Sequence, residues 1–307
     1  MELRAAVTYH HHSGFSVQVG ETLLIFDYWQ GENGELPPPA QITRESFSSY
    51  SQVFVFVSHA HPDHLDPVIF SWLEGNPVTY IVSNDTPIGI RGKRMAPGDN
   101  LLLAPGVRAT AYGSTDLGVS FLVEVGGLSI FHAGDLNLWH WREESTLREI
   151  EAAEKAFEEA IKPLIGKHID LCMFPVDPRM GALFDAGANH FILSVKPRLF
   201  FPMHWQGRSE VAVDFARRAH NKTTEVVALT KPGEYAQITF SETSIYMHIV
   251  EPPVEKKEKN KKEENLIKEA VDSLPQEVAP SAPITLEAYD ENDPFVDTDL
   301  PVSLDDQ

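Results

Sequence analysis

The residues that decide the fold are VFVFVSHAHPDH, at positions 53–64. Positions 53–57 hold only valine and phenylalanine, which predicts a strand buried on both faces. Four potential metal ligands follow within six positions: His59, His61, Asp63 and His64. Side chains two residues apart in an extended segment point the same way, so the first two histidines can share one metal ion. A turn after them would aim the aspartate and the last histidine at a second ion.

The residues after this cluster predict a helix. Asp66 and Pro67 are of the types preferred at a helix N-cap and at the first helical position, so we expect a helix that extends through Trp72. A buried strand, a loop of ligands and a helix is the local context that a metal site of this kind requires.

His-x-His-x-Asp-His after a buried strand resembles the signature of the metallo-β-lactamase superfamily of metal-dependent hydrolases. Two later segments resemble its other elements in the right order, FHAGD at 131–135 and FPMHW at 201–205. HSGF at 12–15, followed by TLLIFD at 22–27, resembles the opening hairpin of a broad subgroup that includes ascorbate-lactonase-like and phospholipase-D-like members. The loop DLNLWHW at 135–141 resembles an uncharacterised bacterial branch. The resemblance covers roughly residues 3–250.

The resemblance implies a complete set of ligands for two metals. The first metal would be held by His59 and His61, the second by Asp63, His64 and His204, and Asp135 would bridge them. Either Asp63 or Asp135 would also orient the attacking group, so these two carboxylates are the predicted catalytic residues.

One expected ligand is missing from the first site. The loop that usually supplies a third histidine is AYGSTDLG here, at 111–118, and it contains none. Either Asp116 or Ser114 substitutes, or the first site is weak. In the second case the resting protein would hold one tight ion, or an oxygen-preferring metal such as Mn²⁺.

Three more residues near these motifs have open alternatives. His12 is either close to the metals or a residue of the hairpin alone. Asp27 follows a predicted strand, where it would accept the second ring N–H of a metal-binding histidine or cap the next turn. His132 is the missing ligand, a residue that supports a ligand from behind, or a residue of the core.

Aromatic and basic residues beside the motifs are candidates for binding substrate. Trp139, His140 and Trp141 would wall a substrate pocket, or the indoles would only anchor their loop. Arg179 follows another core strand, where it would clamp a carboxylate or phosphate, or form an ion pair with Asp177.

The rest of the pattern predicts a sandwich. Strand patterns occur at 3–9, 15–19, 22–26, 53–57, 78–82, 107–112, 119–125, 128–132, 170–174, 198–201, 225–229, 236–240 and 244–250. One helix is expected from near Glu143 to Pro163, and another over 209–219. Hairpins mixed with helices predict an α/β (α+β) fold, a four-layer αββα sandwich of two mixed β-sheets.

Composition divides the chain into a domain and a tail. Residues 1–250 are expected to form the hydrolase domain, and residues 251–307 an acidic, mostly disordered tail. The tail holds 16 acids and 6 lysines, which is half of the net charge of −20. Neither part has a basic stripe, so a nucleic-acid partner held through phosphate contacts is not expected.

Composition also predicts a cytoplasmic protein. No apolar run is long enough to span a membrane, and the first residues lack the pattern of a signal peptide. A single cysteine, Cys172, suits a reducing compartment and lies in an apolar run, where a buried and inert thiol is expected. The oligomeric state is left open.

These features together predict a metal-dependent hydrolase. A hydroxide formed on one or two Zn²⁺ ions, with Mn²⁺ or Fe²⁺ as alternatives, would attack a small ester, lactone, amide or phosphodiester. The motifs of serine hydrolases, phosphate-binding loops and dinucleotide sites do not occur. Two other classes remain: a mononuclear iron oxidoreductase of the dioxygenase kind, and a metal-binding module without activity.

Overall fold

The computed structural model describes residues 2–73, 78–141, 144–219, 221–241 and 244–253. The chain divides into two units, Met1–Val254 and Glu255–Gln307, and the second unit lies outside the described residues. The predicted acidic tail therefore stays a prediction, and the fold below is that of the first unit.

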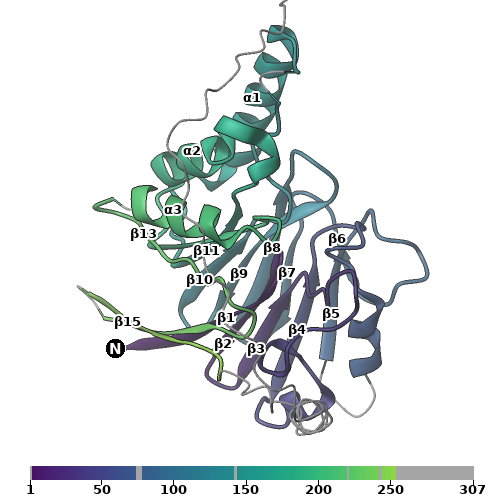
Figure 1. The fold of residues 1–307 in the computed structure, drawn as a ribbon. Coiled ribbons are helices and arrows are strands. Elements are labelled where there is room, and N and C mark those ends of the chain that lie inside the picture. The colour runs from purple at the N-terminus through teal and green to yellow at the C-terminus, as the bar shows by residue number, and fades with distance from the viewer. Residues whose placement is uncertain (1, 74–77, 142–143, 220, 242–243, 254–307) are drawn as a thin grey trace, which may run out of the picture. The chain divides into compact units, whose positions relative to one another are not determined.

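The first of two β-sheets has eight strands, and half of it is parallel (Figure 1). Strands β3 to β6 run parallel, whereas the remaining neighbours pair antiparallel. In spatial order the strands are β15 (Ile245–Val250), β14 (Tyr235–Phe240), β1 (Leu3–His11), β2 (Gly14–Val19), β3 (Thr22–Phe26), β4 (Gln52–Val57), β5 (Val78–Ser83) and β6 (Lys93–Met95).

The second sheet has seven strands and is also mixed. Strands β10 to β13 run parallel, and β7 to β10 form antiparallel pairs. In spatial order the strands are β13 (Glu225–Val226), β12 (Leu199–Met203), β11 (Leu171–Pro175), β10 (Leu128–His132), β9 (Val119–Val125), β8 (Val107–Gly113) and β7 (Asn100–Ala104).

The main core lies between the two sheets. Phe56 on β4 meets Phe121 on β9, with ring centroids 5.2 Å apart, and Phe26 stacks on Phe56. All three side chains are fully buried. Burial of a side chain of this size stabilises the fold by roughly 2–3 kcal/mol, so the sheets are held by apolar contact and not by the polar site at their edge.

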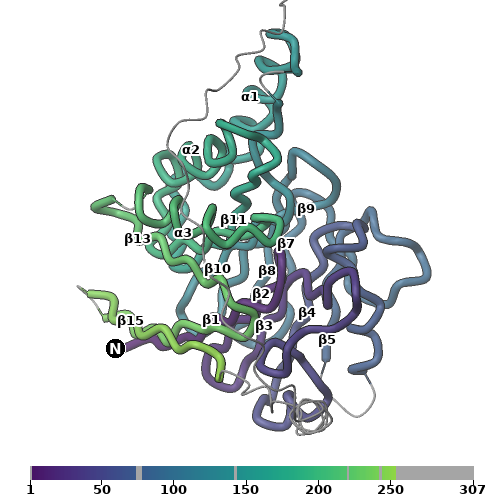
Figure 2. The backbone as a smooth tube through the Cα atoms, in the orientation of Figure 1, coloured from purple at the N-terminus to yellow at the C-terminus, as the bar shows by residue number. Residues whose placement is uncertain are grey.

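Helices cover the outer face of the second sheet (Figures 1 and 2). Helix α2 (Ala186–Val195) packs on β11, α3 (Ser209–Ala219) packs on β12 and β13, and α1 (Leu147–Ile161) packs on α2. The outer face of the first sheet is covered differently. Three 3₁₀ helices lie there, η1 (Pro38–Ala40), η2 (Arg44–Phe47) and η3 (Pro67–Trp72), around a second apolar cluster that includes Tyr28, Phe47 and Trp72.

The structure confirms the predicted sandwich of two mixed sheets, with differences in detail. The helix expected from near Glu143 begins instead at Leu147, because Thr146 caps it and exchanges hydrogen bonds with Glu149. Strands β6 and β7 were not predicted, since their exposed and polar positions break the apolar pattern. Strand β13 is two residues long, against the five expected. Cys172 is buried in β11, as expected.

The parallel strands end at one rim, which collects the polar residues. Asp27 follows β3, His59 follows β4, and Asp135, Asp177 and His204 follow β10, β11 and β12. Open sheets place ligands at the carboxyl ends of parallel strands, where loops leave the sheet. Within the described ranges, no helix is both long and apolar enough to cross a bilayer.

Candidate metal centre

The first half of the centre begins with the strand-end histidines. His59 Nε2 and His61 Nδ1 are 2.9 Å apart, so both nitrogens face one point. The other nitrogen of His59 is 2.9 Å from Ser58 Oγ, which fixes the ring. His59 is fully buried, whereas His61 is partly exposed.

The second half is formed by residues from two sheets. The turn after His61 redirects the chain, because the backbone N–H groups of His64 and Leu65 both donate to its carbonyl. His204, from the end of β12, joins Asp63 and His64 in one group whose ligand atoms all lie within 4.8 Å of one another.

Asp135 lies between the two halves. Its Oδ1 is 3.2 Å from His64 Nε2 and 3.4 Å from His204 Nε2, whereas its Oδ2 is 3.5 Å from His59 Nε2. Each carboxylate oxygen thus faces a different half. Gly134 makes this possible: its φ is +55°, and a Cβ there would lie 2.7 Å from Ser58 Cβ.

The buried carboxylate of Asp27 contacts His64 directly and is linked to His59 through Ser58. Asp27 Oδ2 accepts a hydrogen bond from His64 Nδ1 at 2.8 Å and one from Ser58 Oγ at 2.6 Å. Its Oδ1 accepts from the Ser58 backbone N–H at 2.7 Å. Asp27 therefore orients His64 directly, and His59 through the Ser58 hydroxyl.

A second buried carboxylate stands behind His204. Asp177 Oδ2 is 2.8 Å from His204 Nδ1. The guanidinium of Arg179 pairs with the same carboxylate through Nε and Nη2, at 2.9 Å and 2.5 Å from Oδ2. The Asp177–Arg179 ion pair is therefore present, and it leaves Arg179 half-exposed.

Asp116 comes close to the first half. Its carboxylate lies within 4.8 Å of the ligand atoms of His61 and Asp135. Gly118 allows this approach, because its φ is +72° and a Cβ would lie 2.0 Å from the Ser58 carbonyl oxygen. The side chain of Asp116 is exposed. The Ser114 hydroxyl oxygen accepts a hydrogen bond from the backbone N–H of Asp116 at 3.3 Å.

His132 and His140 lie outside the groups of ligands in the described part of the chain. Both ring nitrogens of His132 are engaged, Nε2 with the Ser13 carbonyl at 2.8 Å and Nδ1 with the Gly134 N–H at 3.2 Å. The ring of His132 is thus held in the core, where it stacks on Phe26. His140 is buried, with its Nδ1 unpartnered.

The ring of His12 lies in the centre. Its ring lies 4.1 Å from that of His204, and its Nε2 is 3.2 Å from Asp63 Oδ2. It belongs to the same group of ligand atoms as Asp63, His64 and His204.

Burial and close charges shift the pKa values of this cluster. Burial acts to raise the pKa of Asp135, but His64 and His204 outweigh it and hold the pKa well below its ordinary value. Burial acts to lower the pKa of His64, but Asp135 and Asp27 hold it well above its ordinary value. Without metal, the proton on His64 therefore occupies a position that an ion would take.

Burial and close charges also shift the pKa values of His12 and Asp63. Burial, together with the charge of His204, lowers the pKa of His12 to about 4, so the ring is neutral and keeps a free lone pair. Burial acts to raise the pKa of Asp63, but its contact with His12 and the charge of His64 outweigh burial. The pKa of Asp63 is therefore below its ordinary value, and the carboxylate stays ionised.

These residues fit a divalent metal. His12 Nε2, His64 Nε2 and Asp135 Oδ1 are buried without a hydrogen-bond partner, although buried polar atoms of described residues normally have one. Two ligands of a tetrahedral Zn²⁺, each about 2.0–2.1 Å from the ion, lie about 3.4 Å apart. The contacts of Asp135 with His64, His204 and His59 lie between 3.2 and 3.5 Å, which matches that spacing.

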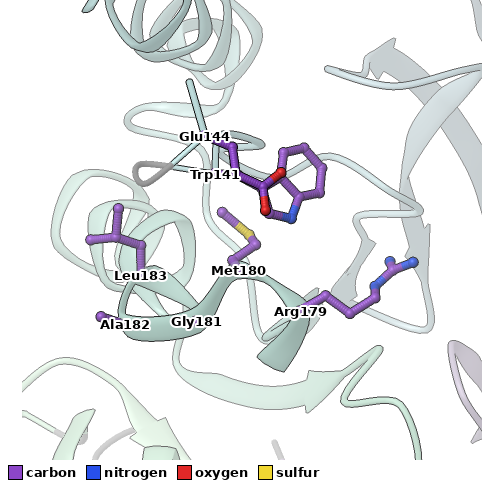
Figure 3. A pocket seen from close by; sticks show the side chains of 7 residues that line it. All are labelled: Trp141, Glu144, Arg179, Met180, Gly181, Ala182 and Leu183. Carbon is purple, nitrogen blue, oxygen red and sulfur yellow. The ribbon is translucent and has the colours of Figure 1, made fainter. Parts of the chain in front are cut away.

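A small pocket lies between Trp141 and the segment 179–183 (Figure 3). Its cavity measures about 160 Å³, and its wall includes Trp141, Met180 and Arg179. Trp141 stacks on Trp139, whose ring centroid is 5.9 Å from that of His204 and whose Nε1 donates to the Asp135 carbonyl. The pocket wall is thus connected to the centre through two loops.

Comparison with known proteins agrees with this geometry. No family model matches the chain. The chain is 27% identical over 231 residues to a "UPF0173 metal-dependent hydrolase" of Heliobacterium modesticaldum. The match covers 68% of this chain and 86% of that protein. It is also 27% identical over 258 residues to one of Opitutus terrae, which spans 76% of this chain and 99% of the relative.

A solved structure has the same fold. It is Igni18, a metallo hydrolase from Ignicoccus hospitalis, with a TM-score of 0.55, 19% identity, and coverage of 78% of this chain and 99% of that one. At 19% identity this likeness shows the fold. Both relatives carry the name metal-dependent hydrolase, and those names leave the substrate unstated.

Sequence reasoning missed two residues of the site. Ser58 links Asp27 to His59, and Asp177 holds His204 in addition to Arg179. The role of Asp177 could have been inferred from the sequence. An aspartate directly after a core strand lies on the same rim as the ligands, where it can accept a ring N–H.

Proposed function

We propose that the centre binds two divalent ions, Zn²⁺ in the first place with Mn²⁺ or Fe²⁺ as alternatives, and hydrolyses a small ester, lactone, amide or phosphodiester. The observation that carries the proposal is the convergence of imidazole and carboxylate atoms on the two sides of Asp135. On the second side, His12 Nε2, His64 Nε2 and Asp135 Oδ1 are buried without a hydrogen-bond partner in the described part of the chain. An unpaired buried polar atom is unfavourable by about 1–3 kcal/mol, so this many in one place calls for a cation.

The proposed ligands divide between the two halves. His59, His61 and Asp116 hold the first ion, with Asp116 in the place of the absent histidine. Asp63, His64 and His204 hold the second, and Asp135 bridges. Two carboxylates and two imidazoles around the first ion also suit the harder Mn²⁺.

The ions and the chain have separate tasks. When bound, the ions supply a water of lowered pKa and a Lewis acid for the oxygen of the bond to be broken. Asp63 and Asp135 remain ionised and can accept a hydrogen bond from the attacking group, which orients it. Asp27 and Asp177 hold the rings of His64 and His204 in fixed positions.

The substrate is proposed to lie against the pocket wall of Trp141 and Met180. A cavity of about 160 Å³ is smaller than a typical drug-binding pocket of roughly 300–1,000 Å³, which favours a compact molecule. Arg179 keeps part of its guanidinium exposed beside Asp177 and can bind a negatively charged group of the substrate.

A panel of ester, lactone, amide and phosphodiester substrates tests this function. The protein is stripped of metal, reloaded with Zn²⁺ or Mn²⁺, and compared with the His204→Ala variant. We expect turnover in the reloaded protein only. His168→Ala is the matched control, because that histidine is mostly exposed and pairs with Asp170 at the other end of β11.

The same experiment separates the competing classes. Visible absorption by bound iron, with consumption of oxygen and no hydrolysis, would support an iron oxidoreductase. Full loading with metal and no turnover on any member of the panel would support a module without activity. Either result would contradict the proposed hydrolysis.

A further inference from the structure

The ring of His12 is positioned like a ligand of the second half. Its side chain is 5% exposed, and its Nε2 is 3.2 Å from Asp63 Oδ2. That nitrogen has no hydrogen-bond partner among the described residues, so the approach to the carboxylate lacks hydrogen-bonding geometry. A separation of this size between a nitrogen and an oxygen is close to the roughly 3.4 Å expected between two ligands of one tetrahedral ion.

The turn that carries His12 is fixed on several sides. The backbone N–H of His12 donates to Tyr9 Oη at 3.0 Å, and its carbonyl accepts from the backbone N–H of His204 at 3.2 Å. The next carbonyl, of Ser13, contacts His132 Nε2 at 2.8 Å. The tip of the β1–β2 hairpin is therefore tied to both sheets, and the ring cannot drift from the centre.

The backbone of His12 is strained. Its φ of +54° lies in the left-handed region, which residues other than glycine rarely adopt. His204, the ligand beside it, has a φ of +62°. Strain of this kind, of order 1–3 kcal/mol for each residue, persists where the surrounding structure enforces it, and it is concentrated at functional sites.

We propose that His12 is a ligand of the second ion, together with Asp63, His64 and His204. This rests on the metal centre proposed above and extends it, because the sequence motifs imply only the other three for that half. The added imidazole makes the second half richer in nitrogen than the first. The second half then selects Zn²⁺ or Fe²⁺, whereas the first half, with Asp116, accepts oxygen-preferring ions more readily.

Two variants test the ligand role without disturbing the turn. His12→Gly suits a positive φ and leaves a space for free imidazole, and His12→Asn also tolerates this backbone but is too short to reach the ion. His11→Ala is the matched control, because it removes the neighbouring ring of the same hairpin, which packs on Trp29. Zn²⁺ affinity is measured by competition with a chromogenic chelator, and the Co²⁺-substituted proteins are compared by visible absorption.

The expected result is a loss of Zn²⁺ affinity of at least about 100-fold in both variants at position 12, the upper end of what residues behind the ligands contribute. The Co²⁺ spectrum should change, and added imidazole should restore affinity to His12→Gly but not to His12→Asn. His11→Ala should match the wild type.

Two results would overturn the inference. One is affinity within twofold of the wild type with an unchanged Co²⁺ spectrum. The other is a loss of affinity that imidazole does not restore and that leaves the spectrum unchanged, which would give His12 a structural role only. A wild-type protein that binds no ion, and that His64→Ala leaves unaltered, would instead contradict the metal centre itself.

Discussion

The two halves of the centre are built differently. In the second half, His64 and His204 are buried, and each donates its other ring N–H to a buried carboxylate, Asp27 or Asp177. In the first half, His59 is held by a hydroxyl group, and His61 is partly exposed. An anionic acceptor fixes an imidazole and makes it more basic, so the second half should hold its ion more tightly.

The difference also divides the work between the halves. Asp116 is exposed and lies on a loop, whereas the ligands of the second half come from the ends of two sheets. Asp63 is the exception there, with a side chain 34% exposed. We infer that the second half organises the centre and that the first half is the more open to solvent and substrate.

The largest effect is expected on metal content, when one histidine is removed from each half in turn. His204→Ala should leave less than about one ion per chain, because it opens the tight half and the bridge beside it. His61→Ala should keep about one ion, and the wild type about two. Elemental analysis after gel filtration measures this. Equal losses in the two variants would contradict the asymmetry.

The next effect tests the carboxylate behind the ligand. Asp177→Asn should lower metal affinity about 10- to 100-fold, because the amide is a weaker acceptor for the His204 ring. Asp170→Asn is the control, since Asp170 is also a buried carboxylate paired with an arginine, Arg198, but lies at the opposite end of β11. A similar loss of affinity in both variants would point to general destabilisation.

The third prediction concerns the pH dependence of metal affinity. Because the pKa of His64 is raised in the metal-free protein, an ion must displace its proton, and affinity should rise about tenfold per pH unit as long as the pH is below that raised pKa. Calorimetry in buffers of different ionisation enthalpy should detect the released proton. Affinity independent of pH between 6.5 and 8 would be inconsistent with this.

The raised pKa of His64 has the opposite effect on the stability of the metal-free protein, which should fall as the pH rises. A raised pKa stabilises the fold fully below the unfolded value of about 6.5, and this contribution is lost as the pH rises through the folded value. The metal-free protein should therefore lose stability in alkaline solution, unlike the loaded one. Urea unfolding of the two forms at several pH values measures the difference.

The smallest effect sharpens the description of the first half. Asp116→His should raise Zn²⁺ affinity there several-fold and lower the preference for Mn²⁺, because it replaces an oxygen ligand with an imidazole. Competition between the two metals measures it. Asp116→Ala should weaken both, and Ser114→Ala should change neither. A loss of affinity in Ser114→Ala would assign the missing ligand to Ser114 instead.

The sequence predicted the fold because strand ends and ligands coincide in it. Residues 53–64 place the metal ligands directly after a buried strand, and the later Gly134–Asp135 and Met203–His204 segments repeat that arrangement. The rim could therefore be inferred without coordinates. Of the 3₁₀ helices over the first sheet, η3 was predicted as a helix, because Asp66 caps it and Pro67 begins it. The helices η1 and η2 could not be inferred, since short segments such as the one around Phe47 carry no helical period.

The hydrogen-bond network behind the ligands was less accessible. The contact between Asp27 and Ser58 joins residues 31 positions apart, and that between Asp177 and His204 joins residues 27 apart. Such pairs depend on which strands are neighbours, which one sequence does not specify. His12 remained ambiguous for the same reason, because its place at the centre depends on how the hairpin meets β12.

Anomalous X-ray scattering at the zinc edge, from crystals of the Zn²⁺-loaded protein, tests the central claim most directly. We predict two peaks on either side of Asp135, the stronger one at about 2.0–2.2 Å from His64 Nε2, His204 Nε2 and a carboxylate oxygen of Asp63. Zinc bound elsewhere on the molecule, with the rings of His64 and His204 left unligated, would contradict it.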